Sequence, residues 1–288
     1  MKTKLFIISF FLILLTASTS ASVKLSKDAT ISILTCSPGN ELYSLFGHTG
    51  IRVVDKANNM DIVFNYGTFD FATQGFYFKF ARGLLPYQLS CSEFHRFLSS
   101  YIHDERSVYS QTLNLDSIQK QYLMDLLVEN YEPANREYLY NFLYDNCSTR
   151  VRDIIEKSTG NQITWIAQPS TKSFWNLLDE YLGRSPWIQW GIHTILGSPA
   201  TSTATIHEQM FLPDYLMYRL DSAAHNGTPL VQPIETVYEA PEQDLSTPWY
   251  FSPFFVFAIC TLALILFLQK VKSRRLLKAI AIPFFIAT

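Results

Sequence analysis

The first clear pattern along the chain is a pair of β-rich stretches. HTGIRVVD and DIVFNYG are dense in β-branched and aromatic residues, and the turn-forming residues KANN separate them. This pattern predicts an antiparallel hairpin. If Asp55 pairs with Met60, then His48 and Asn65 point to the same face, because side chains two apart on a strand share a face. A slip of one residue would bring Tyr66 to that face instead.

Helical and strand patterns follow the hairpin. The stretch FYFKFARGLLPYQLS predicts a second strand pair or a strand and a loop, SEFHRFLSSYIHDE has helical spacing, and RSVYSQTLNL indicates a strand. Residues 116–133 predict an amphipathic helix that begins after Asp116 as N-cap and ends at a proline. These elements together predict an α+β fold, in which helices pack on an antiparallel sheet.

Both ends of the chain carry membrane-targeting patterns. At the N-terminus, two lysines, an apolar run from Leu5 to Leu15 and small residues near Ala21 are typical of a cleaved export signal. Near the other end, residues 251–269 are uncharged and long enough to span a bilayer as a helix. Trp249 and Tyr250 precede this span at the position of an aromatic belt.

The charge that follows the span sets its orientation. Two lysines and two arginines lie at residues 270–275, so the positive-inside rule places that side in the cytoplasm and the region between the two apolar segments outside the inner membrane. A further apolar run begins near residue 276 and stops after half a span. We therefore expect the front part of a longer polytopic protein, with a signal peptide (1–21), a catalytic core (22–165), a helix and loop extension with linker (166–248) and a transmembrane region (249–288).

Composition excludes several other functions. The 288 residues are 48% hydrophobic with a net charge of −2, which gives no electrostatic reason to expect nucleic acid as a partner. Glycine-rich phosphate loops are missing from the sequence. The histidines have no ligand spacing, and HEQMF at His207 lacks the second histidine of a metalloprotease helix. We expect neither a metal nor a cofactor.

The candidate chemistry lies in NFLYDNCSTRVRDII. The pattern predicts a helix that begins at or beside Cys147, with the thiol on the inward stripe at its N-terminal end. Free backbone N–H groups and the helix dipole lower the pKa of a thiol at such a position, and the same N–H groups can stabilise an oxyanion. A small buried hydrophobe is the alternative reading of Cys147. The polar neighbours favour a reactive thiol: Asp145, Asn146, Ser148, Thr149 and Arg150.

The other cysteines leave a question of pairing. Cys260 lies inside the predicted span, and Cys36, Cys91 and Cys147 form an odd number in an oxidising compartment. A disulfide between Cys36 and Cys91 would leave Cys147 free, but the sequence alone does not establish that pairing.

Several of these motifs resemble one family in the same order. SPGNELYSLFGHTGIRV, DIVFNYGTFDF, YNFLYDNCSTRVRDII and MFLPDYL resemble the exported N-terminal domain of the Bacteroides-type lipoprotein N-acyltransferases (Lnb). The resemblance implies a permuted papain-like thiol fold, similar to lecithin:retinol acyltransferase, in which the histidine strand precedes the cysteine helix. It implies Cys147 as nucleophile and His48 as base. The resemblance identifies the third residue, which orients the base, less directly. We choose Asn65, and Tyr66 and Asp70 are the alternatives.

The implied activity is acyl transfer between two membrane molecules. A phospholipid would give its acyl chain to Cys147, and the N-terminal amine of a diacylated lipoprotein would accept it. Candidate donors to the oxyanion, or supports of the site, are Asn141, Tyr144 and Asn146, which the sequence does not separate. A periplasmic thiol peptidase or amidase acting on cell-wall peptide would use the same Cys–His pair. A binding module with a structural Cys147 is a third hypothesis.

Overall fold

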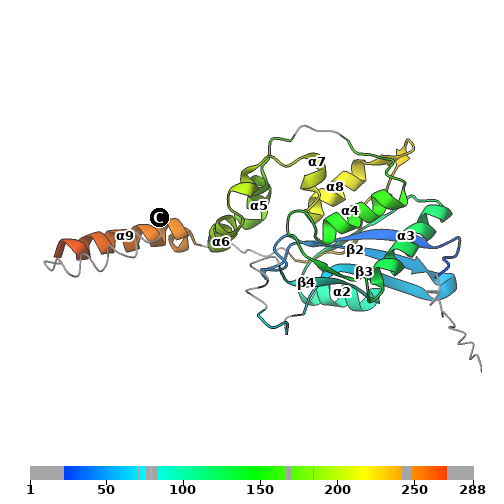
Figure 1. The fold of residues 1–288 in the computed structure, drawn as a ribbon, viewed down its shortest axis with the longest axis horizontal. Coiled ribbons are helices and arrows are strands. Elements are labelled where there is room, and N and C mark those ends of the chain that lie inside the picture. Colours follow the sequence, from blue (N-terminus) through cyan, green and yellow to red (C-terminus); the bar gives the residue numbers. More distant parts are fainter. Residues whose placement is uncertain are drawn as a thin grey trace, which may run out of the picture.

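A computed structural model describes residues 23–70, 72–75, 79, 84–166, 170–183, 185–241 and 248–270. The expected signal peptide and the apolar run after residue 275 lie outside these residues, as does most of the stretch between residues 76 and 83. The described part is an α+β structure, as the sequence predicts, built on an antiparallel sheet with helices on both faces (Figure 1).

The main sheet has seven strands within the described residues, in the order β10-β5-β1-β2-β3-β4-β6. Their bounds are β1 Thr30–Cys36, β2 His48–Asp55, β3 Met60–Thr68, β4 Pro86–Glu93, β5 Val108–Thr112, β6 Glu137–Leu139 and β10 Glu235–Tyr238. A small second sheet consists of β7 Ile163–Thr164, β8 Ala224–His225 and β9 Thr228–Pro229. The edge strand β10 comes from late in the chain, so the segment after residue 165 is joined to the same sheet as the hairpin.

The helices are divided between the sheet faces and one end of the domain. Their bounds are α2 Phe94–His103, α3 Ser117–Tyr131, α4 Cys147–Ser158, α5 Phe174–Leu182, α6 Pro186–Leu196, α7 Ile206–Gln209, α8 Pro213–Ser222 and α9 Pro253–Lys270. Short 3-10 helices are η1 Lys56–Asn58, η2 Ser198–Thr201 and η3 Trp249–Phe251. In Figure 1, α3, α4 and α8 lie above the sheet and α2 lies below it.

Two apolar clusters fill the two faces. Ile31, Ile51 and Phe64 pack with α3, α4 and α8, whereas the neighbouring positions Leu34 and Val63 pack with α2. This alternation follows from the period of two along a strand, and it fixes which face each strand residue points to. A third cluster, around Phe174 and Leu178 of α5, joins the helical region to the loop before β2.

The predicted hairpin register is confirmed. Asp55 pairs with Met60, and the ladder continues to the pair of Ile51 and Phe64. Strand β3 then departs from regular pairing with β4 between Asn65 and Thr68, where a β-bulge lies. The helix that begins after Asp116 is also confirmed, with a capping box between Asp116 and Gln119.

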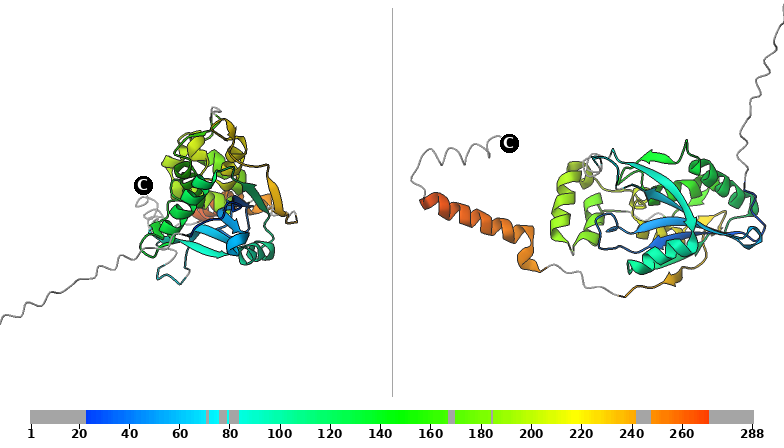
Figure 2. Two further views of the ribbon diagram at one scale, coloured as in Figure 1. Left: turned by 90° about the vertical axis from the view of Figure 1, so that its right-hand side faces the viewer. Right: turned by 90° about the horizontal axis from the view of Figure 1, so that it is seen from below.

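The apolar helix near the C-terminal end is present as α9. It is long and apolar enough to cross a membrane, and it is the only such helix in the described part of the chain. The right-hand panel of Figure 2 shows α9 standing away from the rest of the domain. A mean hydropathy of 2.0 over 18 residues accords with a span rather than a core helix, since almost none of it is buried.

Candidate active site

The nucleophile candidate is the first residue of α4, positioned by the cap before it. Asn146 is buried, and its side-chain oxygen accepts a hydrogen bond from the Thr149 backbone N–H at 3.0 Å. The Asn146 amide nitrogen donates to the carbonyl oxygens of Phe142 at 2.9 Å and Phe211 at 2.8 Å. An Asn cap satisfies an otherwise free helix N–H. Here it also ties the start of α4 to two loops, so the direction of Cys147 is fixed.

Strand β2 is clamped against this helix end. The hydroxyl groups of Thr49 and Ser148, both fully buried, form a hydrogen bond of 2.8 Å. The backbone N–H groups of Thr49, Ser148 and Cys147 are close enough to the Cys147 sulfur to lower the pKa of the thiol, against the rise that burial causes. Because Thr49 follows His48, this clamp brings the histidine next to the thiol. Backbone N–H groups gathered at one sulfur are the donors that an oxyanion at an attacked carbonyl requires.

His48 forms its partner bond on the same hairpin. Its Nε2 lies 2.5 Å from Oδ1 of Asn65. His48 pairs across the sheet with Cys36, on the face that α2 covers, and Asn65 shares that face as the register predicts. Because the amide oxygen is an acceptor, Nε2 carries the proton and Nδ1 is left free to accept one. The hairpin therefore provides both the imidazole and the amide bonded to it.

A glycine provides the space in which thiol and imidazole meet. A Cβ atom at Gly67 would lie 3.7 Å from Cβ of Cys147 and 3.9 Å from Cε1 of His48. Cβ of Cys147 and Cε1 of His48 are therefore separated by no more than the sum of these two distances. The gap between them lies at the end of β2 and β3. Gly67 has a φ of +91° and lies in the β-bulge of β3. A left-handed backbone angle at this position favours glycine, which also leaves the gap open.

The electrostatics of the pair differ from the sequence expectation. Burial, and then the charge of Arg106, lower the pKa of His48 to about 4. Burial raises the pKa of Cys147, and the backbone N–H groups of Thr49, Ser148 and Cys147 offset only part of that rise. The expected lowering of the Cys147 pKa is therefore wrong. The physical reason is that desolvation of the sulfur outweighs the helix N-terminus. The resting pair is a neutral thiol beside a neutral imidazole.

The structure separates the other predicted site residues. Asn146 donates its amide hydrogens to the carbonyl oxygens of Phe142 and Phe211, so it supports the start of the helix and leaves no donor for an oxyanion. Asn141 accepts from the backbone N–H of Leu143 and Tyr144, closing a turn. Tyr144 is 53% exposed, with its ring against Phe174. None of these three contacts joins the side chain to the Cys–His pair.

The two substitutes for Asn65 also lie elsewhere. Tyr66 is buried on the opposite face of the hairpin, and its hydroxyl accepts from Asn130 at 2.7 Å. Asp70 is exposed and accepts from the backbone N–H of Ala72 at 2.8 Å. The position bonded to His48 is Asn65.

Sequence reasoning missed a tyrosine cluster beside the sulfur. The hydroxyl of Tyr138 lies 4.0 Å from the point that a Cβ atom at Gly67 would occupy, between the thiol and the imidazole. Tyr87 and Tyr140 stack at 4.1 Å, and Tyr87 also contacts Phe69 at 5.1 Å. Burial raises the pKa values of all three tyrosines, and the charge of a Cys147 thiolate would raise them further, which accords with their closeness to it. The run YLY at residues 138–140 could have indicated this cluster, because Tyr138 and Tyr140 are two residues apart and would share a face of an extended strand.

The aromatic contacts continue to the surface. Phe69 also contacts Tyr43, whose side chain is 54% exposed. A cavity of about 600 Å³ lies apart from this row; Ser37, Leu45 and Tyr181 are among its lining residues, whereas neither Cys147 nor His48 is. The row of aromatic rings therefore runs from an exposed loop to the neighbourhood of the thiol.

The suggested disulfide is wrong. All four cysteines have free thiols. Cys36 is buried in the cluster against α2, whereas Cys91 packs against the cluster on the other face of the sheet. Residues on opposite faces of a sheet cannot bring their sulfur atoms together. Cys147 is therefore free without any pairing of the other two.

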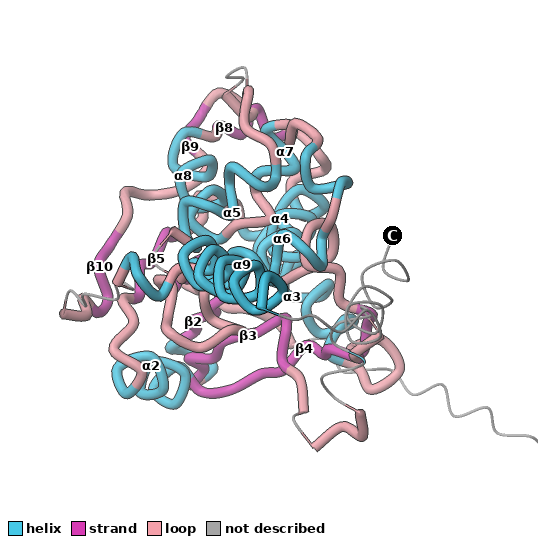
Figure 3. Tube along the Cα trace, turned by 90° about the vertical axis from the view of Figure 1, so that its left-hand side faces the viewer, coloured by secondary structure: helices cyan, strands magenta, loops and turns pink. Residues whose placement is uncertain are grey.

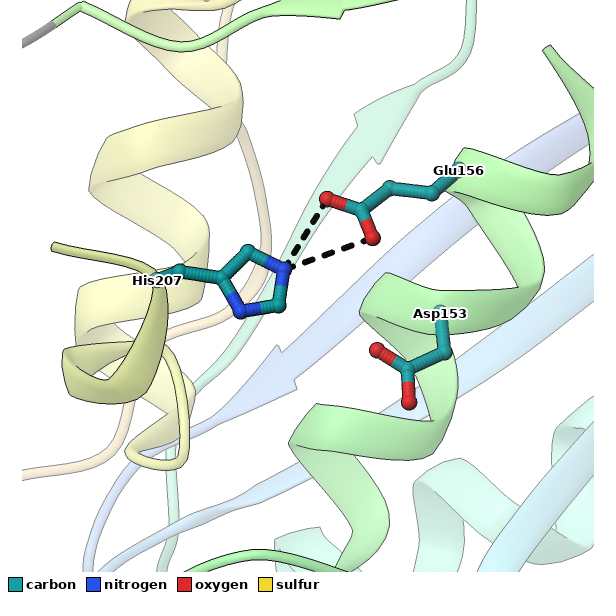
Figure 4. Close-up of side chains that lie close together, drawn as sticks. All are labelled: Asp153, Glu156 and His207. Carbon is teal, nitrogen blue, oxygen red and sulfur yellow. Dashed lines mark hydrogen bonds and ion pairs between the residues drawn. The ribbon is translucent and has the colours of Figure 1, made fainter. Parts of the chain in front are cut away.

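One further cluster joins α7 to α4. His207 lies 3.1 Å from Glu156, with Asp153 beside them, as Figure 4 shows. Among the described residues this is the one group of His, Cys, Asp and Glu close enough to share a cation. The Arg152 guanidinium already pairs with Asp153 at 2.6 Å, and Trp165 donates to Glu156 at 2.9 Å. These partners make it an ion-pair network that holds α7 on α4.

Comparison with known proteins gives the family of the chain. The model of the family described as the Lnb N-terminal periplasmic domain matches residues 17–179. The chain belongs to this family. The Lnb N-terminal domain thus contains β1 to α4 and most of α5, including the Cys147–His48 pair. No curated protein and no solved structure matches the chain. Family and α9 together indicate a membrane-anchored protein whose Lnb N-terminal domain is periplasmic.

Proposed function

We propose that this protein is a membrane-tethered Cys–His acyltransferase that N-acylates diacylated lipoproteins. The observation that carries the proposal is the meeting of Cys147, at the start of α4, with the His48–Asn65 pair across Gly67. A thiol, a base and an orienting amide are the parts that nucleophilic acyl transfer needs. The order of His48 before Cys147 supports a permuted papain-like fold.

The first half-reaction transfers the acyl chain to sulfur. Nδ1 of His48 takes the Cys147 proton while the sulfur bonds to the ester carbonyl carbon of a phospholipid, and the carbonyl oxygen becomes an oxyanion. When the intermediate collapses, the carbon–oxygen ester bond breaks. The leaving alkoxide takes the proton from His48 and departs as a lysophospholipid. A thioester remains on Cys147.

The second half-reaction transfers the chain to nitrogen. The neutral N-terminal amine of the lipoprotein attacks the thioester carbon and gives a proton to His48. The carbon–sulfur bond then breaks, and the sulfur recovers that proton. In both halves we assign the stabilisation of the oxyanion to the backbone N–H groups of Cys147 and Thr49, which lie near the sulfur. A neutral resting pair fits this scheme, because proton transfer accompanies attack at each step.

Two features support lipid substrates over soluble ones. The aromatic row from Tyr43 to Tyr140 offers an apolar path from the surface toward Cys147. The span α9 keeps the site close to the inner membrane, which raises the effective concentration of both lipid-bearing substrates. A peptidase or amidase acting on cell-wall peptide would need neither feature.

The deciding experiment compares two cysteine variants in cells. Cys147→Ala is expected to abolish the N-linked acyl group in mass spectra of lipoprotein N-terminal peptides. Cys91→Ala is the matched control, because it removes another free, half-buried thiol that lies away from His48. Unchanged lipopeptides with altered cell-wall fragments would instead indicate the amidase. If Cys147→Ala changed neither, the thiol would be structural and the protein a binding module.

A further inference from the structure

Helix α6 has an apolar face that the domain does not cover. Trp187 and Trp190, which we call the outer face of α6, are 40% and 51% exposed, and Ile195 in the last turn is 66% exposed. On the other side, Ile188 and Ile192 pack against the α5 cluster. Residues 186–196 contain no Asp, Glu, Lys or Arg. Large apolar side chains gathered on one uncharged, exposed helix face are typical of a surface that contacts another apolar phase.

The outer face of α6 meets the start of the span. The indole N–H of Trp187 donates to the carbonyl oxygen of Phe251 at 2.5 Å. The rings of Trp187 and Trp190 lie 5.6 and 5.5 Å from that of Phe257. In Figure 3, looking along the molecule from the side of α9, α6 lies behind that helix. Helix α6 of the domain is therefore in contact with the start of the span.

The depth of this contact is that of an aromatic belt. Phe257 is four residues into α9, which is about 6 Å along a helix that rises 1.5 Å per residue. Trp249 and Tyr250, the belt expected from the sequence, precede the span and are exposed. Tryptophan is enriched at this level because its ring is apolar and its N–H is polar. Trp187 and Trp190, about sixty residues before the span, lie at the same depth as this belt.

We propose that α6 lies in the boundary between headgroups and acyl chains of the leaflet from which α9 enters the membrane. The outer face of α6 contacts lipid, while its inner side holds α5 and the domain above it. The contact with α9 argues for lipid rather than a soluble partner, because it places both tryptophans beside the first turns of the span. The Lnb N-terminal domain is thereby held in one orientation on the membrane surface.

Tryptophan fluorescence of the full chain tests this placement. The protein is placed in nanodiscs made with phospholipids whose acyl chains carry bromine or do not, and the quenched emission is measured. Of the five tryptophans, Trp187, Trp190 and Trp249 are expected to be quenched. The double variant Trp187→Phe, Trp190→Phe should therefore retain roughly a third of the quenched emission of the wild type.

Trp175→Phe is the matched control, because the Trp175 indole stacks on His193 within the domain at 4.7 Å. It should leave the quenched emission unchanged. Equal quenching in the wild type and the double variant would overturn the proposal, as would an equal loss in the control. Should the double variant not fold, Ile195→Asp should lower quenching and Ile118→Asp should not; Ile118 is 80% exposed, on α3. The readout is independent of acyl transfer.

A second inference concerns the orphan hydroxyl beside the thiol. Oη of Tyr138 is buried and has no hydrogen-bond partner within the described part of the chain. Its ring is held by the Arg150 guanidinium, 3.6 Å from the ring centroid, and Arg150 is held in turn by Asp145 at 2.6 Å. A buried polar group without a partner is costly, and such groups are retained where a ligand supplies the bond.

Resting on the proposed acyl transfer, we infer that the Tyr138 hydroxyl donates a hydrogen bond to the oxyanion formed at Cys147. The hydroxyl lies 4.0 Å from the point that a Cβ atom at Gly67 would occupy, and Cys147 and His48 both lie near that point. A carbonyl in that gap is therefore within reach of the hydroxyl. Burial raises the pKa of Tyr138 well above its usual range, so the proton stays available at working pH.

Two Tyr→Phe variants separate this role from a structural one. Tyr138→Phe is expected to lower kcat about 10²-fold with KM unchanged, and to leave the unfolding midpoint unchanged or higher, because an unpaired group is removed. Tyr66→Phe loses the bond to Asn130, so it should lower the midpoint and keep kcat. Wild-type kcat in Tyr138→Phe, with Cys147→Ala inactive, would overturn this inference and leave the proposed function intact. Acyl transfer by Cys147→Ala would refute both this inference and the proposed function.

Discussion

Replacement of Gly67 by alanine tests whether the reaction takes place in the gap between Cys147 and His48. The added methyl carbon would lie at van der Waals distance, 3.7 Å from Cβ of Cys147 and 3.9 Å from Cε1 of His48. No clash prevents folding, so the stability cost is that of the backbone angle. For an L-residue at a φ of +91° this cost is about 1–2 kcal/mol.

The effect on rate should be larger than the effect on stability. The methyl group fills the space that an attacked carbonyl must enter, and a displacement of about 1 Å costs about 100-fold in rate, or about 2.7 kcal/mol. Gly227→Ala is the matched control, since Gly227 has a φ of +78° and nothing within 4 Å of an added Cβ. Both variants should shift a urea unfolding curve similarly, whereas only Gly67→Ala should lose transfer from phospholipid to a lipopeptide.

Two results would refute this reasoning. A wild-type transfer rate in Gly67→Ala would mean that the carbonyl does not enter between the thiol and the imidazole. Equal losses of rate in Gly67→Ala and Gly227→Ala would mean that general destabilisation, rather than a blocked gap, lowers the activity.

Three further predictions concern the cap, the N-terminal segment and the base. Asn146→Ala should lower the free energy of unfolding by about 2–4 kcal/mol, because it removes a cap and leaves two carbonyl oxygens unpaired. The variant Ser173→Ala, which removes the half-buried cap of α5 alone, should cost about 1 kcal/mol in the same urea titration. Hydrogen bonds from Ser26 hold the pKa of Asp55 at about 2, below its unfolded value of 3.8; stability should therefore fall as pH drops from about 4 to 2, and Asp55→Asn should flatten that fall in acid unfolding curves. The pKa of His48, about 4 when folded and 6.5 when unfolded, predicts that stability declines as pH falls from 6.5 to 4. It also predicts that acylation of Cys147, the half-reaction that needs no free amine, persists at pH 5 and is lost below 4; a pH profile of lysophospholipid release with half-maximal rate near 6.5 would contradict it.

The hairpin and the helix start were predictable from the sequence because their signals are local. The turn residues KANN between two β-rich runs indicated the pairing of Asp55 with Met60, which places His48 and Asn65 on one face, and the structure has this register rather than the one shifted by one residue. Asn146 before Cys147 gave the N-terminus of α4. Such patterns depend on the period of a strand or helix and on the chemistry of a cap, so they need no knowledge of distant residues.

Other features of the site depend on contacts between distant parts of the chain, and no local sequence pattern predicts these contacts. The ionisation of Cys147 follows from how much water the packed domain excludes, so a rule about helix ends gave the wrong direction. Tyr138 acquires its position only when β6 joins the sheet beside β4. Trp187 meets Phe257 only because α6 and α9 pack together. By itself the sequence determined the helices and strands and the reactive residues that they contain, because strand period, helix period and caps are local patterns. Which side chains share a dielectric environment, and which face meets the membrane, was decided by tertiary packing, because burial is a property of the whole fold.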